Sequence, residues 1–453
     1  MAYMKKIFFS RKYFKFIYIL YVFINTLALG YLGIENNFLA IGMIIWALIL
    51  LIHDIYHREI AINKDFILIS SYGIILFLAT LINYRYSDYK SYLIALMQII
   101  IFALIFGYKK NTTYKNIKEE IKLIIPFSNL LVGLASGISL VMYLFNFYDT
   151  KNGWVVGVSG NRLFGVYFNC NPAAFLACIT ILLALLAIKY NYRYKKLYYL
   201  NIGIQFTYIL LTKCRSALII LAIIATALIY YCFIKKKNYV KIKKFFILCS
   251  ICILIIFSSL LIDKGISTIF SNQDEIQEES RFQLNKIIEA SKLFISGDPS
   301  KAVDLIDQIS SGRIELLNTS IEVWKFSPII GIGANNFRKM GIDKTNGTTV
   351  QAIQVVHSHN EFIESFVTTG IIGGTIFIIF FILCLKKCFK LLKVSNYNSA
   401  YFNILICSLI VGCEVIGGFF DYGVFYVYSL STVLAWNFLG YLHWGIENQN
   451  KIF

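Results

Sequence analysis

Four cationic or titratable residues have the chemistry to bind an anion and to move a proton. They are Arg162, Arg215, Arg313 and His359. A guanidinium group binds phosphate oxygens through a fork of parallel hydrogen bonds. An imidazole titrates near neutral pH and can accept a proton from a hydroxyl group, which an arginine cannot do. Each of these residue types could therefore take part in binding an anion or in moving a proton, and each also has a structural interpretation.

Each arginine also has a structural interpretation. Arg162, in SGNRLFGVYFNCNPAAF, could be an interfacial residue whose head group reaches water, and Arg215, in LLTKCRSAL, could anchor a tight turn. Arg313 follows Ser-Ser-Gly in the first turn of a predicted helix, where free backbone amides and the guanidinium would meet at one anion. The alternative for Arg313 is a solvated loop charge.

His359, in QVVHSHNEFIESF, lies where a long loop returns to an apolar segment. His357, Glu361 and Glu364 could complete a metal site with it, but no cysteine lies at ligand spacing, so we favour base catalysis and predict no metal. A structural alternative has the imidazole capping the following helix. Because His357 is so close, the two histidines could also exchange roles.

The remaining histidines and two acidic residues have weaker signals. His53 and His57 are interpreted as an interfacial helix end, and His443 as another interfacial residue. Glu414 and Asp421 could form a polar binding subsite at the outer face or cap a helix, and the helix cap is favoured.

The elements that position these residues are transmembrane helices. Hydrophobic residues make up 58% of the 453 residues, the mean hydropathy is +0.66 and there are only 4 prolines, which is more apolar surface than one soluble core can bury. The net charge of +18 is concentrated between apolar runs, which indicates membrane topology rather than a nucleic-acid partner. The 10 cysteines lie mostly within apolar runs and predict no disulfide framework.

About a dozen helices of roughly 17 to 25 residues are needed to place these runs in a bilayer. The predicted spans are residues 14–33, 37–52, 66–83, 92–107, 123–146, 172–188, 196–211, 216–234, 245–262, 361–385, 400–418 and 423–442. The sequence therefore predicts an all-α polytopic membrane protein.

Charge bias orients these spans. Most of the 43 Lys and Arg residues fall on the side that holds both termini, so we expect both termini in the cytoplasm. The predicted organisation is residues 1–262 as transmembrane helices 1–9, residues 263–360 as a large extracytoplasmic loop, and residues 361–453 as transmembrane helices 10–12. The first helix is expected to remain uncleaved, because no small-residue cleavage site follows it.

The long loop has helical periodicity of its own. An amphipathic helix is predicted from Ser280 to Phe294, and a second from Ser310 or Ser311 to the residues before Pro328. GIGANNF then predicts a glycine-rich turn that returns the chain to the membrane.

These motifs resemble a known family. SSGRIELLNTSIEVWKFSPIIGIGANNF, followed by VVHSHNEFIESFVTTGIIGG, is similar to the signature of the bacterial O-antigen ligase and polymerase superfamily, the Wzy and WaaL type. The segments that contain Arg162 and Arg215 are similar to earlier arginine motifs of that family. The resemblance covers most of residues 150–385, whereas the preceding helices match only as generic spans.

The resemblance implies a GT-C-like membrane glycosyltransferase that uses undecaprenyl-diphosphate-linked glycans at the outer face of the inner membrane, without a metal, cofactor or nucleotide sugar. It implies that Arg162, Arg215 and Arg313 bind the donor diphosphate, and that His359 and Arg215 are catalytic. His357, Asn360 and Glu361 would support them. The displacement is expected to invert the anomeric centre.

Three functions fit the sequence. The favoured one is an O-antigen or capsular polysaccharide polymerase, because Lys-, Ile- and Asn-rich usage suggests an AT-rich genome whose bearers often make such polymers. A ligase would pass the glycan to a lipid, wall or protein acceptor. A flippase or transporter is less favoured, because charges are scarce inside the helices and no repeat of the two halves is visible. Expected partners are the lipid-linked glycan, the acceptor, membrane lipids and a chain-length regulator or flippase, with no nucleic acid.

Overall fold

The computed structural model describes residues 7–33, 37–234, 312–344, 357–394, 399–421 and 429–448, together with residues 289, 292, 293, 301 and 305–307. The predicted ninth span lies outside the described residues. So does the predicted helix from Ser280 to Phe294, apart from three helical positions.

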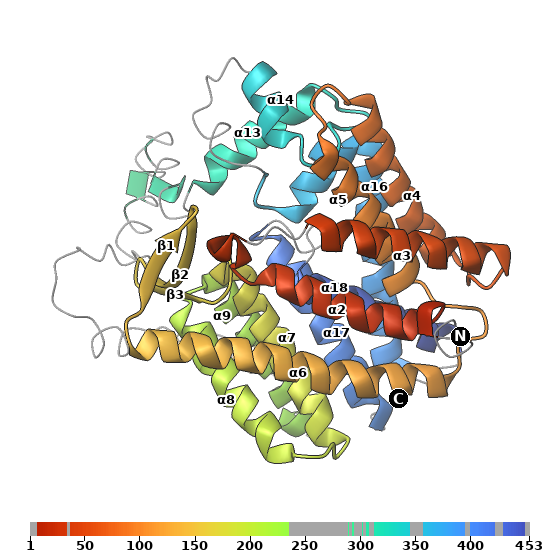
Figure 1. Cartoon of the computed structure of the whole chain (residues 1–453), viewed down its shortest axis with the longest axis vertical. Coiled ribbons are helices and arrows are strands. Elements are labelled where there is room, and N and C mark those ends of the chain that lie inside the picture. Colours follow the sequence, from red (N-terminus) through yellow and green to blue (C-terminus); the bar gives the residue numbers. More distant parts are fainter. Residues whose placement is uncertain are drawn as a thin grey trace.

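The described chain is almost entirely helical, which confirms the all-α membrane fold (Figure 1). Eight of the described helices are long and apolar enough to cross a membrane. All predicted spans except the ninth correspond to helices. Their bounds are α2 Arg11–Thr26, α3 Asn37–Tyr56, α4 Lys64–Ile82, α5 Tyr89–Ile100, α6 Tyr114–Leu144, α7 Cys170–Lys189, α8 Lys195–Leu211, α9 Arg215–Ile229, α16 Glu361–Val394, α17 Ser399–Gly418 and α18 Leu430–Glu447.

Shorter elements continue or connect these helices. A 3-10 helix, η1, at Leu29–Leu32 ends the first predicted span. Wide π turns follow α5 and α9 as η2, Ile101–Phe106, and η3, Tyr230–Ile234. Outside the bundle lie α13, Arg313–Lys325, and α14, Phe337–Lys344.

A small antiparallel sheet, which the sequence analysis did not predict, precedes α7. It consists of β1 Tyr148–Lys151, β2 Trp154–Ser159 and β3 Arg162–Gly165 in the order β1-β2-β3. The connecting pairs Asn152–Gly153 and Gly160–Asn161 all have positive φ, the backbone of a type I′ hairpin turn. Arg162 therefore begins a strand rather than an irregular helix entry.

The core lies at the centre of the bundle around α7 and α18. Nearly every side chain of α7 is buried, and so is nearly every side chain of α18. Neither helix is amphipathic, and a helix that is apolar on all sides is expected to be buried in this way. α7 packs against α6, α8, α9 and α17, while α18 packs against α2, α17 and η2. Trp436 of α18 is fully buried among the rings of Phe102, Phe106 and Phe380.

α16 is broken at Gly370, where φ is 64° and ψ is −169°. The segment before α14 supplies the hydrogen bonds that the helix lacks at this break. The amides of Ile332 and Gly333 donate to the carbonyls of Val367 and Thr368 at 3.0 and 2.9 Å. On the other side of the break, the Ile371 amide donates to the carbonyl of Pro328 at 2.8 Å. The GIGANNF turn is thus hydrogen-bonded to a transmembrane helix, which fixes how α13 approaches the bundle.

Candidate functional site

The four residues singled out by the sequence come from separate elements that meet at one end of the bundle. Arg162 begins β3, Arg215 begins α9, Arg313 begins α13, and His359 precedes α16. In Figure 1 the sheet, the start of α9 and α13 lie on the same side of the molecule.

Arg162 holds the short α8–α9 connection. Its Nε donates to the carbonyl of Thr212 at 2.8 Å, and its Nη2 donates to the side-chain oxygen of Asn171 in the first turn of α7. These two contacts tie β3 to α7 and to the turn that precedes Arg215. The head group of Arg162 is therefore held by protein contacts and is only partly exposed.

Arg215 is the electrostatic centre of the arginine cluster. The positive charges of Arg313 and Arg162 both act on its half-buried guanidinium group. Like charges repel at short range, and at Arg313 the opposite charge of Asp421 offsets part of this repulsion. The three arginines, which come from distant parts of the sequence, thus face a common region.

Arg313 lies in the first turn of its helix, but the predicted helix start is wrong. The N-cap is Gly312, with φ of 77°, and neither Ser310 nor Ser311 belongs to the described residues. The first-turn amides are not free either, because Asp307 Oδ1 accepts hydrogen bonds from the amides of Ile314 and Glu315 at 2.7 and 3.4 Å. A carboxylate from the same chain occupies the helix N-terminus, so anion binding here falls to the guanidinium.

Arg313 also contacts the histidine segment directly. Its Nη1 donates to the carbonyl of His359 at 3.2 Å. Asp421 is near enough for its opposite charge to stabilise the Arg313 cation, although burial lowers the pKa of Arg313. The guanidinium is therefore linked to both members of the next pair.

His359 is held beside Asp421. Its Nδ1 lies 3.3 Å from Asp421 Oδ1, and the imidazole is 40% exposed whereas the carboxylate is only 6% exposed. The His359 backbone has a φ of 49°, an unusual left-handed conformation for a residue other than glycine. The buried carboxylate of Asp421 thus orients the accessible imidazole of His359.

His357 differs from His359 in its surroundings. Its Nδ1 accepts a hydrogen bond from the backbone amide of His359 at 3.3 Å, which requires an unprotonated nitrogen. Burial, and then the neighbouring His359, lower the pKa of His357 to about 3. His357 is therefore a neutral, supporting residue.

The cap of α16 is Asn360 rather than His359. Asn360 Oδ1 accepts from the amides of Phe362 and Ile363 at 3.0 and 3.1 Å. Glu364 in the same turn accepts from the amide of Ser358 at 2.8 Å. The capping interpretation of the imidazole is wrong, and the cap instead fixes the segment that carries it. Glu361 is fully buried beside this cap.

Sequence reasoning undervalued Asp421 and missed Asn171. Asp421 follows the end of α17, and the N-cap of α18 is Ser429, so Asp421 is not that helix's cap as favoured from the sequence. The only sequence signal for a functional role of Asp421 was its position as an acidic residue in a largely apolar C-terminal region. Glu414 is buried within α17 and is distinct from the pair with His359.

His443, predicted to be interfacial, is 2% exposed, and its Nδ1 lies 2.9 Å from Asp65 Oδ2. Lys387 of α16 forms an ion pair with the same carboxylate. This cluster joins α4, α16 and α18. Lys387 lies 28 residues after His359 in the sequence, so the cluster belongs to the far end of α16 and not to the candidate site.

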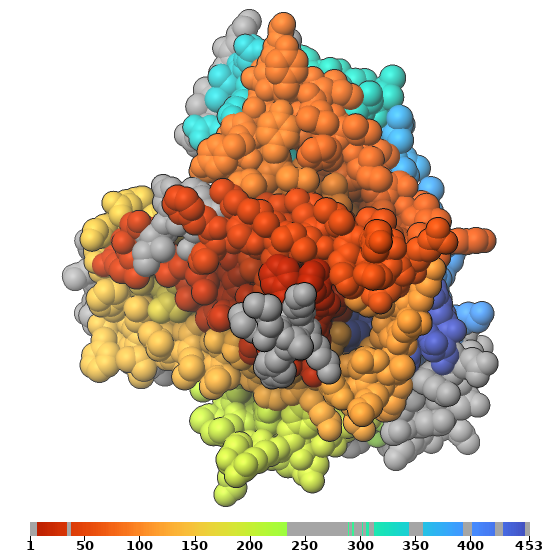
Figure 2. All heavy atoms as spheres, turned by 45° about the vertical axis from the view of Figure 1, so that its right-hand side comes forward, coloured from red at the N-terminus to blue at the C-terminus, as the bar shows by residue number. Residues whose placement is uncertain are grey.

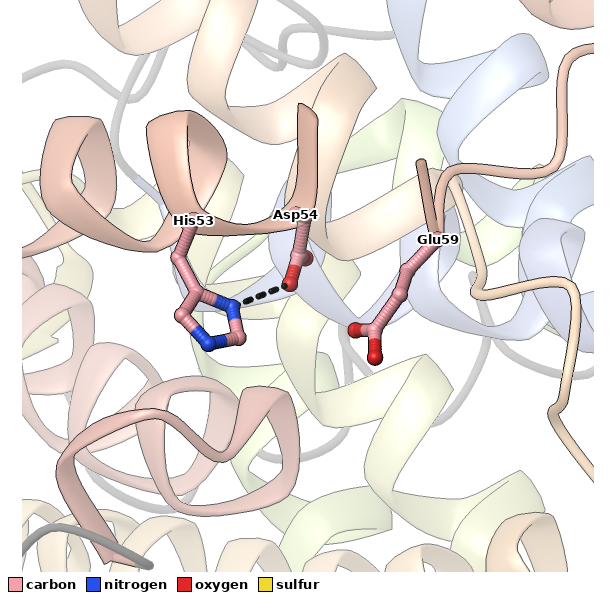
Figure 3. A group of neighbouring side chains, drawn as sticks. All are labelled: His53, Asp54 and Glu59. Atoms are coloured by element: carbon pink, nitrogen blue, oxygen red, sulfur yellow. Dashed lines mark hydrogen bonds and ion pairs between the residues drawn. The ribbon is translucent and has the colours of Figure 1, made fainter. Parts of the chain in front are cut away.

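One group of possible metal ligands occurs in the described part of the chain: His53 and Asp54 of α3 with Glu59 of the following loop (Figure 3). The ammonium group of Lys109 lies 2.7 Å from Asp54 Oδ1 and 2.6 Å from Glu59 Oε2. A lysine therefore already supplies the positive charge between the two carboxylates, and we assign no metal to this group.

The helical bundle defines an integral membrane protein in which the three arginines and His359 lie at one end. Residues 200–378 match the family model described as O-antigen ligase. This match confirms the similarity to the O-antigen ligase and polymerase superfamily and indicates a glycosyltransferase-like enzyme of the inner membrane. It includes Arg215, Arg313 and His359 but neither Arg162 nor Asp421. No curated protein matches the chain.

Proposed function

We propose that this protein transfers a glycan from a lipid diphosphate to a hydroxyl group of an acceptor glycan. The observation that carries the proposal is the meeting of Arg162, Arg215 and Arg313 beside the His359–Asp421 pair. Such a site combines a charge stabiliser for a leaving group with a base for a nucleophile.

The donor diphosphate would be bound by the arginines. Two guanidinium groups act on Arg215, and their mutual repulsion falls when a polyanion lies among them. As the glycosyl–phosphate bond breaks, negative charge grows on the diphosphate oxygens, and preorganised cations stabilise that charge without rearranging. We assign Arg215 the central role, because it receives both neighbouring charges.

His359 would act as the general base. If the carboxylate of Asp421 accepts the Nδ1 proton, the lone pair of the imidazole lies at Nε2, on the accessible part of the ring. The acceptor hydroxyl gives its proton to Nε2 while its oxygen attacks the anomeric carbon. The bond from that carbon to the phosphate oxygen breaks, and the lipid diphosphate leaves as an anion. A single displacement inverts the anomeric centre and needs no metal, cofactor or covalent intermediate.

The polymerase is the favoured reaction. In a polymerase the acceptor is a second lipid-linked repeat unit, whereas in a ligase it is a lipid, a wall polymer or a protein. The preference rests on the Lys-, Ile- and Asn-rich composition noted above, and both reactions use the same bond changes. We place the site at the extracytoplasmic face and both termini in the cytoplasm, on the basis of the charge bias of the loops.

The test is reconstitution in liposomes with a defined undecaprenyl-diphosphate-linked repeat unit. Wild type is expected to form a ladder of products, while Arg215→Ala and His359→Ala form none. A single transfer to another acceptor would instead identify a ligase. Lys90→Gln removes one exposed charge outside the cluster and serves as the control, with activity like wild type. Undiminished turnover in both active-site variants would overturn the proposal.

A further inference from the structure

A cavity among the described residues lies remote from the candidate site. It has a volume of about 640 Å³, and the residues around it include Arg11, Lys12, Lys15, Lys109, Tyr441 and Trp444. Figure 2 shows this side of the molecule, where blue atoms of the C-terminal part are visible in a hollow between the red and amber surfaces.

The cavity lies near the end of α16 that is opposite to His359. Lys387, 26 residues into α16, and His443 of α18 both contact Asp65. Tyr441 and Trp444 of the same part of α18 line the cavity. A helix rises about 1.5 Å per residue, so a large part of the membrane thickness separates the cavity from the arginine cluster.

The carboxylates around the cavity are already paired. Glu119 lies 3.1 Å from Lys12, and Glu120 lies 3.1 Å from Lys15. Glu59 is paired with Lys109, as described above. These acids therefore do not make the cavity a site for an added cation.

Arg11 is the cation whose hydrogen bonds are incomplete. Its Nε donates to Asp54 at 2.6 Å, and its Nη1 donates to the carbonyls of Ala103 and Gly107 at 3.3 and 2.9 Å. Its Nη2 is buried and has no hydrogen-bond partner within the described ranges, and Arg11 as a whole is only 6% exposed. Leaving such a charged donor unsatisfied is unfavourable, so this nitrogen favours an acceptor oxygen from outside the protein.

The rim and one wall of the cavity fit an anionic amphiphile. The exposed Lys110, Lys115 and Lys118 precede or begin α6 next to the cavity and raise the local positive potential. Apolar lining comes from Ile105, Phe106 and Ile117. Basic pockets between transmembrane helices that also have apolar walls are typical binding sites for the head groups of anionic lipids.

We infer that this cavity binds a phosphate-bearing anion, with a phosphate oxygen on Arg11 Nη2. Its charge is balanced by Lys12, whose surface pair with Glu119 is weak, and by the exposed Lys110, Lys115 and Lys118 of the rim. The phosphate can belong to the head group of an anionic phospholipid or to a soluble phosphate ester. The site is separate from the proposed glycan-transfer site and does not depend on it.

The first test measures the thermal unfolding midpoint of the purified full-length protein in a neutral detergent. Dioleoylphosphatidylglycerol, dioleoylphosphatidylcholine and glycerol phosphate are added separately. Specific binding is expected to raise the midpoint by at least about 2 °C. A rise with phosphatidylglycerol alone identifies a lipid ligand, and an equal rise with glycerol phosphate identifies a soluble phosphate. An equal rise with phosphatidylcholine, or no rise with any addition, overturns the inference.

The second test repeats the measurement with variants. Lys12→Gln removes a cation whose surface pair with Glu119 contributes little to stability, so this variant is expected to fold and to lose at least half of the midpoint rise. Arg11→Lys retains the charge but loses the guanidinium fork and is expected to reduce the rise further. Lys90→Gln is the control for the loss of one exposed charge. A midpoint rise that is the same in all three variants and in wild type overturns the inference.

Discussion

Asp421 Oδ1 lies 3.3 Å from Nδ1 of His359, and the two residues are 62 positions apart in the sequence. The carboxylate is nearly buried while the imidazole is accessible. A pair of this kind fixes which nitrogen carries the proton and how the ring is turned. It also distinguishes the surroundings of His359 from those of the buried His357.

Asp421→Asn is expected to lower kcat by about 10²-fold or more, because the amide no longer favours the tautomer with the lone pair at Nε2. KM for the lipid-linked donor should change little, since the arginines remain. Initial rates measured over a range of donor concentrations in liposomes separate the two effects. Asp149→Asn, in the exposed strand β1, is the matched control. A rise in KM with kcat unchanged would contradict an orienting role for Asp421.

Arg162 and Arg215 should respond differently to loss of charge. Arg162→Gln breaks two hydrogen bonds between β3, α7 and the α8–α9 turn, so it should destabilise the protein by about 1–3 kcal/mol as well as reduce activity. Arg215→Gln removes a cation that is repelled by two others, so the unfolding midpoint should be unchanged or higher while turnover falls about 10²-fold. Parallel melting curves and transfer assays test this contrast. Equal destabilisation by both substitutions would argue against repulsion at Arg215.

Gly331 and Gly370 should not tolerate alanine. A Cβ on Gly331 would lie 2.3 Å from the backbone of Thr368, and one on Gly370 would lie 2.2 Å from the carbonyl oxygen of Ile329. Both residues also have positive φ, so each alanine should cost about 2 kcal/mol or more. The yield of monodisperse protein and its unfolding midpoint are the measurements. Gly412→Ala, in a helix with open space around the added atom, is the control and should be neutral or stabilising.

His357 should make the protein sensitive to acid. Burial lowers the pKa of His357 from 6.5, the ordinary value for a solvated imidazole, to about 3 in the fold, so between these values the unfolded chain binds more protons than the native one. The contribution to stability is therefore complete above pH 6.5 and falls as the pH is lowered, by about 1 kcal/mol at pH 5.5. His357→Gln should remove this part of the acid sensitivity. The check is the change in unfolding midpoint between pH 7.5 and pH 5.5, which should be smaller in the variant than in wild type.

Local patterns were sufficient for much of the fold. The apolar runs that correspond to α3, α4, α7 and α17 are continuous in the sequence, and each spans the bilayer by length alone. The motif around His359 carried the family resemblance for the same reason, since neighbouring residues define it. In contrast, the Asn-Gly pair at Asn152–Gly153, between the predicted spans 123–146 and 172–188, is a hairpin-turn signal from which the sequence analysis predicted no strand.

The sequence alone determined that the chain is a multi-spanning membrane protein with a superfamily motif, because hydropathy and short motifs are properties of contiguous residues. Only the tertiary structure decided which side chains meet. The pairing of Asp421 with His359 and the use of Asp307 to close the α13 N-terminus depend on contacts between segments distant in the chain. Helices of similar hydropathy can be arranged in many ways, so their packing, rather than their composition, decides where each polar group lies.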